Sequence, residues 1–142
     1  MSLRIDLDTS KYDVKIRLFR NNLPQFPPKA VKGATDIIEK NMVQVVPVKT
    51  GNLRDSIKKR TAGVFGIVET TAGYGKFVDE DTKPHKIVGN PLLAFQWRGK
   101  LFIRRSVNHP GTKGQQFRRR TLDNSQQEIT GEIARVYNEE MN

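Results

Sequence analysis

The side chains that could hold a metal ion or activate water lie in two short stretches of the chain. They are Asp79, Glu80, Asp81, His85 and His109. Carboxylates and imidazoles can hold a divalent cation that activates water for attack on a phosphate. No motif fixes the spacing of these residues, however, and a run of acids beside a threonine and a proline is typical of a solvated loop. We therefore predict neither a metal site nor a hydrolytic centre.

Other catalytic patterns are missing from the sequence as well. Ser56 and Ser106 have no recognisable base near them, and no glycine pattern that would cradle a phosphate occurs. The chain has no cysteine, which excludes disulfides and thiolate metal sites and indicates a reducing compartment. The sequence thus predicts a protein that is not an enzyme and that uses no cofactor.

A basic segment is the strongest chemical feature of the chain. Residues 98–120 hold eight basic side chains and no acidic one, whereas residues 121–142 hold one basic and five acidic side chains. The eight are Arg98, Lys100, Arg104, Arg105, Lys113, Arg118, Arg119 and Arg120. They could follow nucleic-acid phosphates, with Trp97 available for stacking, or pair with acids of a neighbouring subunit. No known nucleic-acid-binding signature accompanies them, so direct binding of nucleic acid is the alternative function.

The composition describes a polar chain with a thin hydrophobic core. Of the 142 residues, 36% are hydrophobic and 28% are charged, with a net charge of +10. Mean hydropathy is −0.60. The length suits one domain, and a thin core often means that a partner covers part of the apolar surface. No apolar run approaches the roughly 18 residues of a membrane span, and MSLRIDLD lacks a signal-peptide core, so we expect neither a membrane span nor secretion.

The N-terminal part predicts a lead-in followed by one long helix. Residues 3–7 alternate as in a short strand. Residues 11–23 fit both strand and helix periodicity, and we favour a helix because Ser10 resembles an N-cap. From 28 to 46 an apolar stripe recurs at helical spacing, and Pro47 ends that helix. The stripe consists of Val31, Ala34, Ile37, Ile38, Met42 and Val45.

Strand signals dominate the middle of the chain. A short helical turn is predicted over Asn52–Ser56, capped by Thr50 or Asn52. Residues 63–71 are rich in β-branched residues, and Gly66 marks a bulge or a close approach. A turn and a short helix are expected over residues 73–78. Their inward-facing side chains would be Tyr74, Phe77 and Val78.

A hairpin and a second helix complete the predicted order of elements. Residues 79–90 read as a polar loop, and Leu92–Val107 as a hairpin around the turn at 98–100. Phe95, Trp97, Phe102 and Phe117 are expected in a core or an interface. The last helix begins at Phe117 or at a capping box of Ser125 and Glu128. Its apolar face would consist of Leu122, Ile129, Ile133, Val136 and Tyr137. This order predicts an α+β fold, in which a small antiparallel or mixed sheet packs against a long N-terminal helix and a C-terminal helix.

Three stretches resemble the tail-completion, or head–tail joining (neck), proteins of long-tailed bacteriophages and prophages. The first is PVKTGNLRDSI at 47–57, which is similar to a family hallmark of a helix ending in proline, then Thr-Gly, Asn-Leu-Arg and Ser-Ile. The second is YGKFVDEDT at 74–82, with Asp81 in place of the expected glycine. The third is HPGTKGQQFRRRTL at 109–122. There, Arg118 and Arg119 stand where an apolar residue and a proline are expected.

The resemblance implies a structural virion protein without a catalytic site or cofactor. Such proteins form a ring, commonly taken as hexameric, where the tail tube meets the head connector, and DNA passes through the lumen. Implied partners are other copies of the chain, the tail tube and the head connector, with no membrane. The implied location is the tail or neck of the virion, after assembly in the cytoplasm of the bacterial host. The residues that would carry the family signature are Pro47, Thr50, Gly51, Asn52, Leu53, Arg54, Ser56, Tyr74 and Val78.

We accordingly predict a single tail-completion-like domain over residues 1–142. Its parts would be a lead-in (1–27), a long helix (28–46), a sheet region (57–107) and a C-terminal helix (117–140). We also hypothesise that the basic 98–120 segment meets the acidic C-terminal helix or the 79–81 loop of a neighbouring subunit, or faces the lumen.

Overall fold

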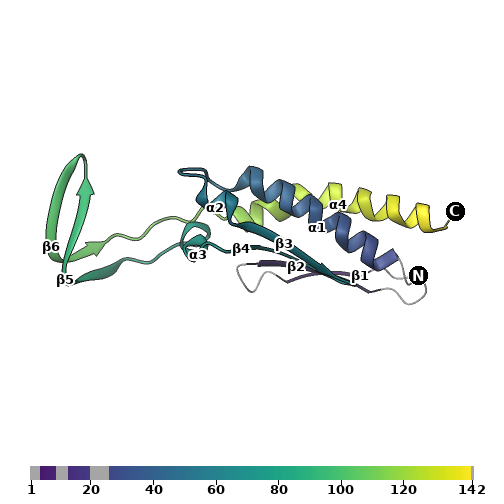
Figure 1. The fold of residues 1–142 in the computed structure, drawn as a ribbon, viewed down its shortest axis with the longest axis horizontal. Helices are drawn as coiled ribbons and strands as arrows, with labels where there is room; N and C mark the ends of the chain where they lie inside the picture. The colour runs from purple at the N-terminus through teal and green to yellow at the C-terminus, as the bar shows by residue number, and fades with distance from the viewer. Residues whose placement is uncertain (1–3, 9–12, 20–25, 142) are drawn as a thin grey trace.

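The computed structural model describes residues 4–8, 13–19 and 26–141. In it, helix α1 (Phe26–Val45) connects the two halves of the hydrophobic core. One side of α1 packs on a four-stranded sheet, and another packs along the C-terminal helix α4 (Phe117–Met141) (Figure 1). The predicted stripe is the buried face of α1: Val31, Ala34, Ile38 and Met42 are buried, with Ile37 and Val45 at its margin. The predicted helix and its end just before Pro47 are confirmed.

The four-stranded sheet is antiparallel throughout. Its strands are β1 (Arg4–Asp8), β2 (Asp13–Phe19), β3 (Ile57–Ala62) and β4 (Phe65–Thr70), and their order in the sheet is β1-β2-β4-β3. Val68 of β4 and Ile57 of β3 are buried under α1. Gly66 allows the closest approach, because a side chain there would collide with Thr35 of α1. The α+β fold class and the close approach at Gly66 are therefore both confirmed.

The helix favoured for residues 11–23 is wrong, because Asp13–Phe19 forms strand β2. This strand pairs with β1 on one side and with β4 on the other, for example Val14 with Val68 and Ile16 with Gly66. Pairing on both sides satisfies the backbone N–H and C=O groups of the strand. The two-residue alternation in this stretch was therefore the correct periodicity. Tertiary pairing overrides the local resemblance to an N-cap.

The corner between α1 and the sheet is built around Gly51. Its φ angle is 85°, a left-handed conformation that glycine adopts without strain. The carbonyl of Gly51 accepts the Asp55 N–H at 2.9 Å, which closes helix α2 (Asn52–Asp55). No side chain caps α2, so the predicted cap by Thr50 or Asn52 is wrong. Leu53 of α2 is buried in the core and so fixes the corner to the body.

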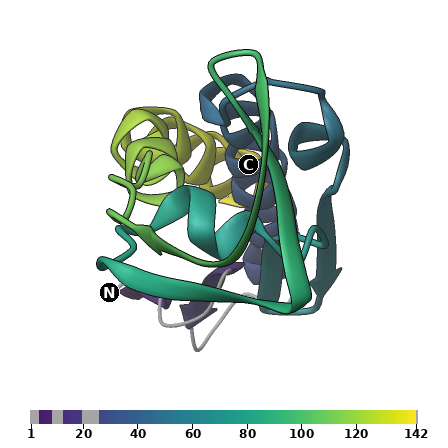
Figure 2. The ribbon, with the colours of Figure 1, turned by 90° about the vertical axis from the view of Figure 1, so that its left-hand side faces the viewer.

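A long hairpin extends away from the rest of the molecule. It consists of β5 (His85–Trp97) and β6 (Lys100–His109), and its turn has positive φ angles at Arg98 (51°) and Gly99 (76°). Below, residues 85–109 are called the arm, and the other described residues the body. Figure 1 shows that the arm stands clear of the body, at the end opposite the C-terminus, and Figure 2 shows the molecule from the end that carries the arm.

The predicted hairpin and its turn are confirmed, but the hairpin is longer than predicted. Residues 85–90, expected in a loop, belong to β5, and the pairing shifts register between Val88 and Leu93. Helix α4 begins at Phe117, the earlier of the two predicted starts. Ser125 therefore lies inside α4, where its hydroxyl donates to the Thr121 carbonyl, and the proposed capping box is wrong. Within the described residues, none of the helices is long and apolar enough to cross a membrane.

Candidate protein interface

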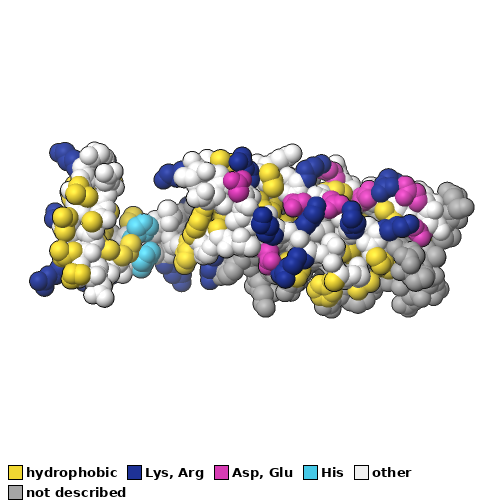
Figure 3. Space-filling model, viewed as in Figure 1, with side chains coloured by type: hydrophobic (Ala, Val, Ile, Leu, Met, Phe, Trp, Pro, Cys, Tyr) yellow, Lys and Arg dark blue, Asp and Glu magenta, His cyan; other side chains and the backbone are white. Residues whose placement is uncertain are grey.

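The arm presents large apolar side chains to solvent on both of its faces. Side chains of a strand alternate between two faces, and residues paired directly across a hairpin share one face. Phe95, Trp97 and Phe102 therefore lie on one face, and Leu101 and Ile103 on the other. The exposed fractions are 59% for Trp97, 65% for Leu101 and 52% for Ile103. Figure 3 shows hydrophobic and basic side chains side by side on the arm.

The aromatic face of the arm is organised by contacts within the hairpin. Phe95 and Phe102 stack across the strands with ring centroids 5.7 Å apart, and Trp97 lies at 6.1 Å from Phe102. The guanidinium of Arg98 lies 4.8 Å from the Trp97 ring, and that of Arg104 lies 5.8 Å from the Phe102 ring. Aromatic pairs and cation–π contacts of this kind stabilise a hairpin modestly. They leave the aliphatic side chains of the opposite face uncovered.

The arm carries positive charge only. Its charged residues are Lys86, Arg98, Lys100, Arg104 and Arg105. In the part of the chain that the structure describes, none of these five forms an ion pair with a carboxylate. The arm is therefore a projecting surface on which apolar and unpaired cationic side chains alternate.

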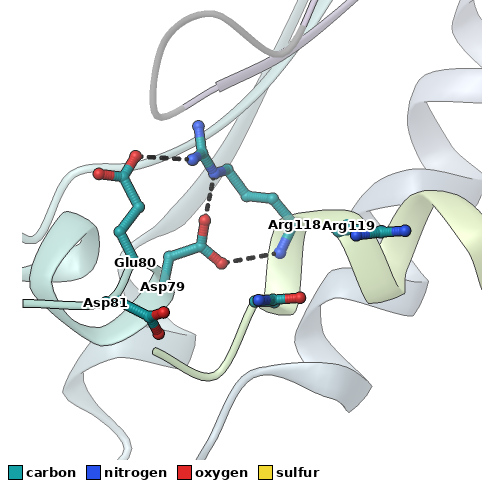
Figure 4. A pocket seen from close by; sticks show the side chains of 6 residues that line it. Asp79, Glu80, Asp81, Arg118 and Arg119 are labelled. Atoms are coloured by element: carbon teal, nitrogen blue, oxygen red, sulfur yellow. Dashed lines mark hydrogen bonds and ion pairs between the residues drawn. The ribbon is translucent and has the colours of Figure 1, made fainter. Parts of the chain in front are cut away.

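The base of the arm is held by a buried ion pair that the sequence did not reveal. The Asp79 carboxylate at the end of helix α3 (Gly75–Asp79) accepts the Arg118 backbone N–H at 3.0 Å and its Nε–H at 2.5 Å. Arg118 Nη2 also donates to Glu80 at 3.1 Å. Figure 4 shows the three side chains converging. The Asp79 and Arg118 side chains are only 5% and 13% exposed. Arg118 therefore fixes the first turn of α4 to α3.

The second and third stretches of the phage resemblance lie side by side at this base. Thr82 and Thr112 bridge the two segments with backbone hydrogen bonds of 2.8 and 3.2 Å. Asp81 accepts the Gly114 N–H at 2.7 Å, so the acid that replaces the expected glycine takes part in the junction. Together with the Asp79–Arg118 pair, these contacts form what we call the clasp (residues 79–82 with 112–118). The clasp joins both strands of the arm to the body.

Of the residues first considered for metal chemistry, the three acids belong to the clasp and the two histidines lie at the base of the arm. A surface pocket of about 290 Å³ is lined by Asp79, Glu80, Asp81, Gln116, Arg118 and Arg119. His85 and His109 face each other across the base of the arm, with ring centroids 5.1 Å apart. Among the described residues, no group of three or more histidines and acids is arranged to hold a metal ion. The carboxylates of Asp79 and Glu80 are instead neutralised by Arg118.

Residues 24–80 match the model of a family described as Bacteriophage HK97-gp10, putative tail-component. Over these residues, the chain is similar to that phage tail family. The matched region runs through α1, the Gly51 corner, β3, β4 and α3. It contains the first resembling stretch and most of the second, so the resemblance to a phage tail family is confirmed. No curated protein and no solved structure matched the chain.

The signature residues inside the matched region lie mainly at the corner between α1 and the sheet. Gly51 and Leu53 are buried there, and the Ser56 hydroxyl donates to the Leu53 carbonyl at 2.7 Å. Val78 packs against the core as predicted. The predicted inward orientation of Tyr74 and Phe77 is wrong, since both side chains are exposed. Pro47, Thr50, Asn52 and Arg54 lie at the partly or fully exposed surface of the corner.

The basic 98–120 segment is divided by the structure into two groups. Arg98, Lys100, Arg104 and Arg105 lie on the arm, whereas Lys113, Arg119 and Arg120 are exposed beside the clasp. Arg118 is in the clasp itself. Four of the five acids of α4 are engaged within the same chain: Lys40 donates to Glu128 at 2.6 Å, Arg135 pairs with Glu132 and Glu139, and Lys29 pairs with Glu140. The α4 of a second copy therefore offers the basic 98–120 segment fewer unpaired acids than the sequence of α4 suggests.

Two of these carboxyl groups are shifted toward the charged form. Hydrogen bonds from Lys40 and then from Asn41 lower the pKa of Glu128. The hydrogen bond from Arg135 lowers the pKa of Glu132 against the opposing effect of burial. Asn41 is itself buried and also donates to Ser125 at 2.9 Å. The contacts of Lys40 and Asn41 join α1 to α4. The sequence alone did not predict that Asn41 would bind residues of α4.

Proposed function

We propose that this chain is a structural virion protein that completes the end of a phage tail and joins it to the head connector. The family match over residues 24–80 carries the proposal, because it identifies a phage tail-related component. The 109–122 stretch, outside the match, supports it by packing against the matched region in the clasp. The role is structural rather than enzymatic and needs no cofactor. Residues 1–142 would act as one domain.

The protein would act as a ring of identical subunits, hexameric on the tail, through whose lumen DNA passes. Ring contacts of this kind are heterologous, so each subunit needs two different contact surfaces. The elongated shape supports this, since the arm and the far end of α1 and α4 lie at opposite ends of the molecule. The partners would be other copies, the tail tube and the head connector. The location would be the neck or tail of the virion, after assembly in the host cytoplasm.

A phage that lacks this protein tests the proposal most directly. We expect such a phage to accumulate complete heads and complete tails that remain unjoined in electron micrographs. Purified wild-type protein added to the mixed lysate should restore joined, infective particles. Normal joining in the mutant phage, or tails of uncontrolled length in place of unjoined parts, would contradict the proposed role.

Ring formation is tested separately on purified tail tubes. Light scattering gives the mass of the free protein, and electron microscopy shows whether added protein forms a cap of defined symmetry on one tube end. We expect a cap on one end only. Protein that stays monomeric and never caps a tube would count against the ring.

A nucleic-acid-binding function is the second candidate, favoured by the exposed arm cations around Trp97. Its clearest property would be salt dependence. Binding to phosphates releases counterions, so the affinity falls steeply between about 50 and 200 mM salt. A gel-shift titration of double- and single-stranded DNA across that range measures it. Tight binding that falls steeply with salt and is lost in Arg104→Glu would favour this candidate.

A further inference from the structure

The arm has the properties of an interface that lacks its partner. Six of the eleven large hydrophobic side chains that are exposed in the described residues belong to the arm: Ile87, Val88, Leu92, Trp97, Leu101 and Ile103. A two-stranded hairpin is marginally stable alone and gains stability when one face is covered. Here both faces keep exposed apolar side chains, Trp97 on one and Leu101 and Ile103 on the other. Contiguous exposed apolar surface with interspersed cations is typical of a protein-binding site.

The charge distribution argues against a second copy of this chain as the main occupant. The body holds twelve acidic side chains within residues 27–84 and 110–140, against fifteen basic ones. In those residues every acid except Asp81 and Asp123 is ion-paired within the chain. Asp81 is already bound to the Gly114 N–H. Within these residues a second body therefore offers little free negative charge, and a second arm would repel the first.

The side chains of the arm favour a protein over nucleic acid. Leu101 and Ile103 are the most prominent groups on one face, with Arg105 beside them. Aliphatic groups gain free energy when they leave water for an apolar surface, which a phosphate backbone does not offer. Trp and Arg, which lie together at the tip as Trp97 and Arg98, are the residues most enriched at the energetic centres of protein interfaces.

We propose that the arm, residues 85–109, docks onto a different virion protein whose surface is apolar at the centre and acidic at the rim. The inference rests on the proposed function, because it takes the partner to be the tail tube or the head connector. Leu101 and Ile103 enter the apolar centre, and Lys100 and Arg105 pair with the acidic rim. The clasp holds the arm at a fixed place on the body while its tip is engaged.

The test uses tails and DNA-filled heads purified from phage that lack this protein. Labelled full-length protein is mixed with each, and bound protein is measured by co-sedimentation. The apolar test variant is Leu101→Ser/Ile103→Ser, matched by Val64→Ser at the exposed β3–β4 turn of the body. The charge test variant is Lys100→Glu/Arg105→Glu, matched by Lys58→Glu on β3, which is also exposed. Thermal melts check that every variant keeps the wild-type body.

We expect each arm variant to weaken binding to one of the two particles by at least about tenfold, while the matched body variants bind as wild type does. Binding by the charge variant should also lose most of its dependence on salt. Arm variants that bind like wild type would overturn this inference alone. Wild-type protein that binds neither particle would overturn it together with the proposed function.

Two further readouts separate the other possible occupants. If the arm variants abolish self-association in analytical ultracentrifugation but leave particle binding intact, the arm contacts a second copy, and the proposal is wrong. If they abolish DNA binding in the gel-shift assay but leave particle binding intact, the arm contacts nucleic acid, and the proposal is again wrong.

Discussion

The body buries its aliphatic side chains and pairs its charges, whereas the arm leaves both in water. Ile38 of α1 is fully buried, but Ile103 of β6 is 52% exposed. Lys59 of β3 is hydrogen-bonded to Asp36 and Glu39, which together raise its pKa, while Lys100 and Arg105 of the arm have no carboxylate near them in the described residues. The same residue types thus contribute to folding in the body and remain exposed to solvent in the arm.

The difference teaches how stability and binding are divided in this fold. Apolar burial is the main favourable term in folding, and the body obtains it from α1, α4 and the sheet together. The arm obtains little from its own chain, so its exposed groups remain available for association. Substitutions in the body should therefore act on the free energy of unfolding, and substitutions in the arm on binding.

The paired variants Ile38→Ala and Ile103→Ala test this division with one chemical change. Ile38→Ala removes buried methyl groups and leaves a cavity, so it should lower the free energy of unfolding by roughly 2–5 kcal/mol. Ile103→Ala removes exposed groups and should change it by no more than about 0.5 kcal/mol. Urea unfolding followed by circular dichroism measures both. Equal losses in the two variants would show that the arm is part of the cooperative folding unit and would break the comparison.

The clasp is where the two regions meet, and Asp79→Ala should damage it. The substitution removes the Asp79 carboxylate from the largely buried guanidinium of Arg118, which keeps its contact with Glu80, and it removes the acceptor for the Arg118 N–H at the start of α4. Removing one member of a buried pair costs several kcal/mol, and we expect about 3 kcal/mol here because Glu80 compensates in part. Thermal melting gives the loss. Glu80→Ala, at the more exposed end of the same contact, is the matched control and should cost much less.

Much of the body could be predicted from its sequence because local periodicity and tertiary burial agree there. The stripe from Val31 to Val45 follows helical spacing, and Pro47 stops the helix for a purely local reason. Residues 13–19 could not be assigned in this way, since their pattern fits both periods. Only pairing with β1 and with β4, which is distant along the chain, decides between them.

The candidate interface was predicted in part. The hairpin and its cations follow from alternation and from the Arg98-Gly99 turn, but their exposure does not, because burial depends on which elements lie opposite. The role of Arg118 could not be foreseen, since Asp79 is 39 residues away in the sequence. One signal was present and unused: apolar residues occur on both faces of a hairpin in which only one face is normally buried.

The Gly51 corner tests the body with a smaller expected effect, because a substitution there strains only the backbone conformation. A β-branched residue is disfavoured at φ 85°, so Gly51→Val should lower the free energy of unfolding by roughly 1–3 kcal/mol. The position offers ordinary contact distances to a new Cβ, which makes a clash unnecessary to explain the loss. Gly51→Asn is the matched control, since asparagine tolerates this region better. Head–tail joining should fail only in proportion to unfolding. A Val variant with unchanged melting temperature that nevertheless abolished joining would make the corner a contact surface.

Acid should destabilise the body by removing the charge of its ion-paired carboxylates. The folded state lowers the pKa of Glu128 from an ordinary value of 4.5 and also lowers that of Glu132. A lowered carboxyl pKa contributes stability that is present above the unfolded value and is lost as the pH falls through the folded value. The melting temperature should therefore decline as the pH drops below about 4.5. Glu128→Gln should flatten part of that decline, because glutamine does not titrate. Lys100 of the arm forms no ion pair with a carboxylate in the described residues, so removing its charge should not affect the acids that lose charge in this range. A matched titration of Lys100→Gln should therefore follow the wild-type curve. A flattening equal to that of Glu128→Gln would place a carboxylate against the arm.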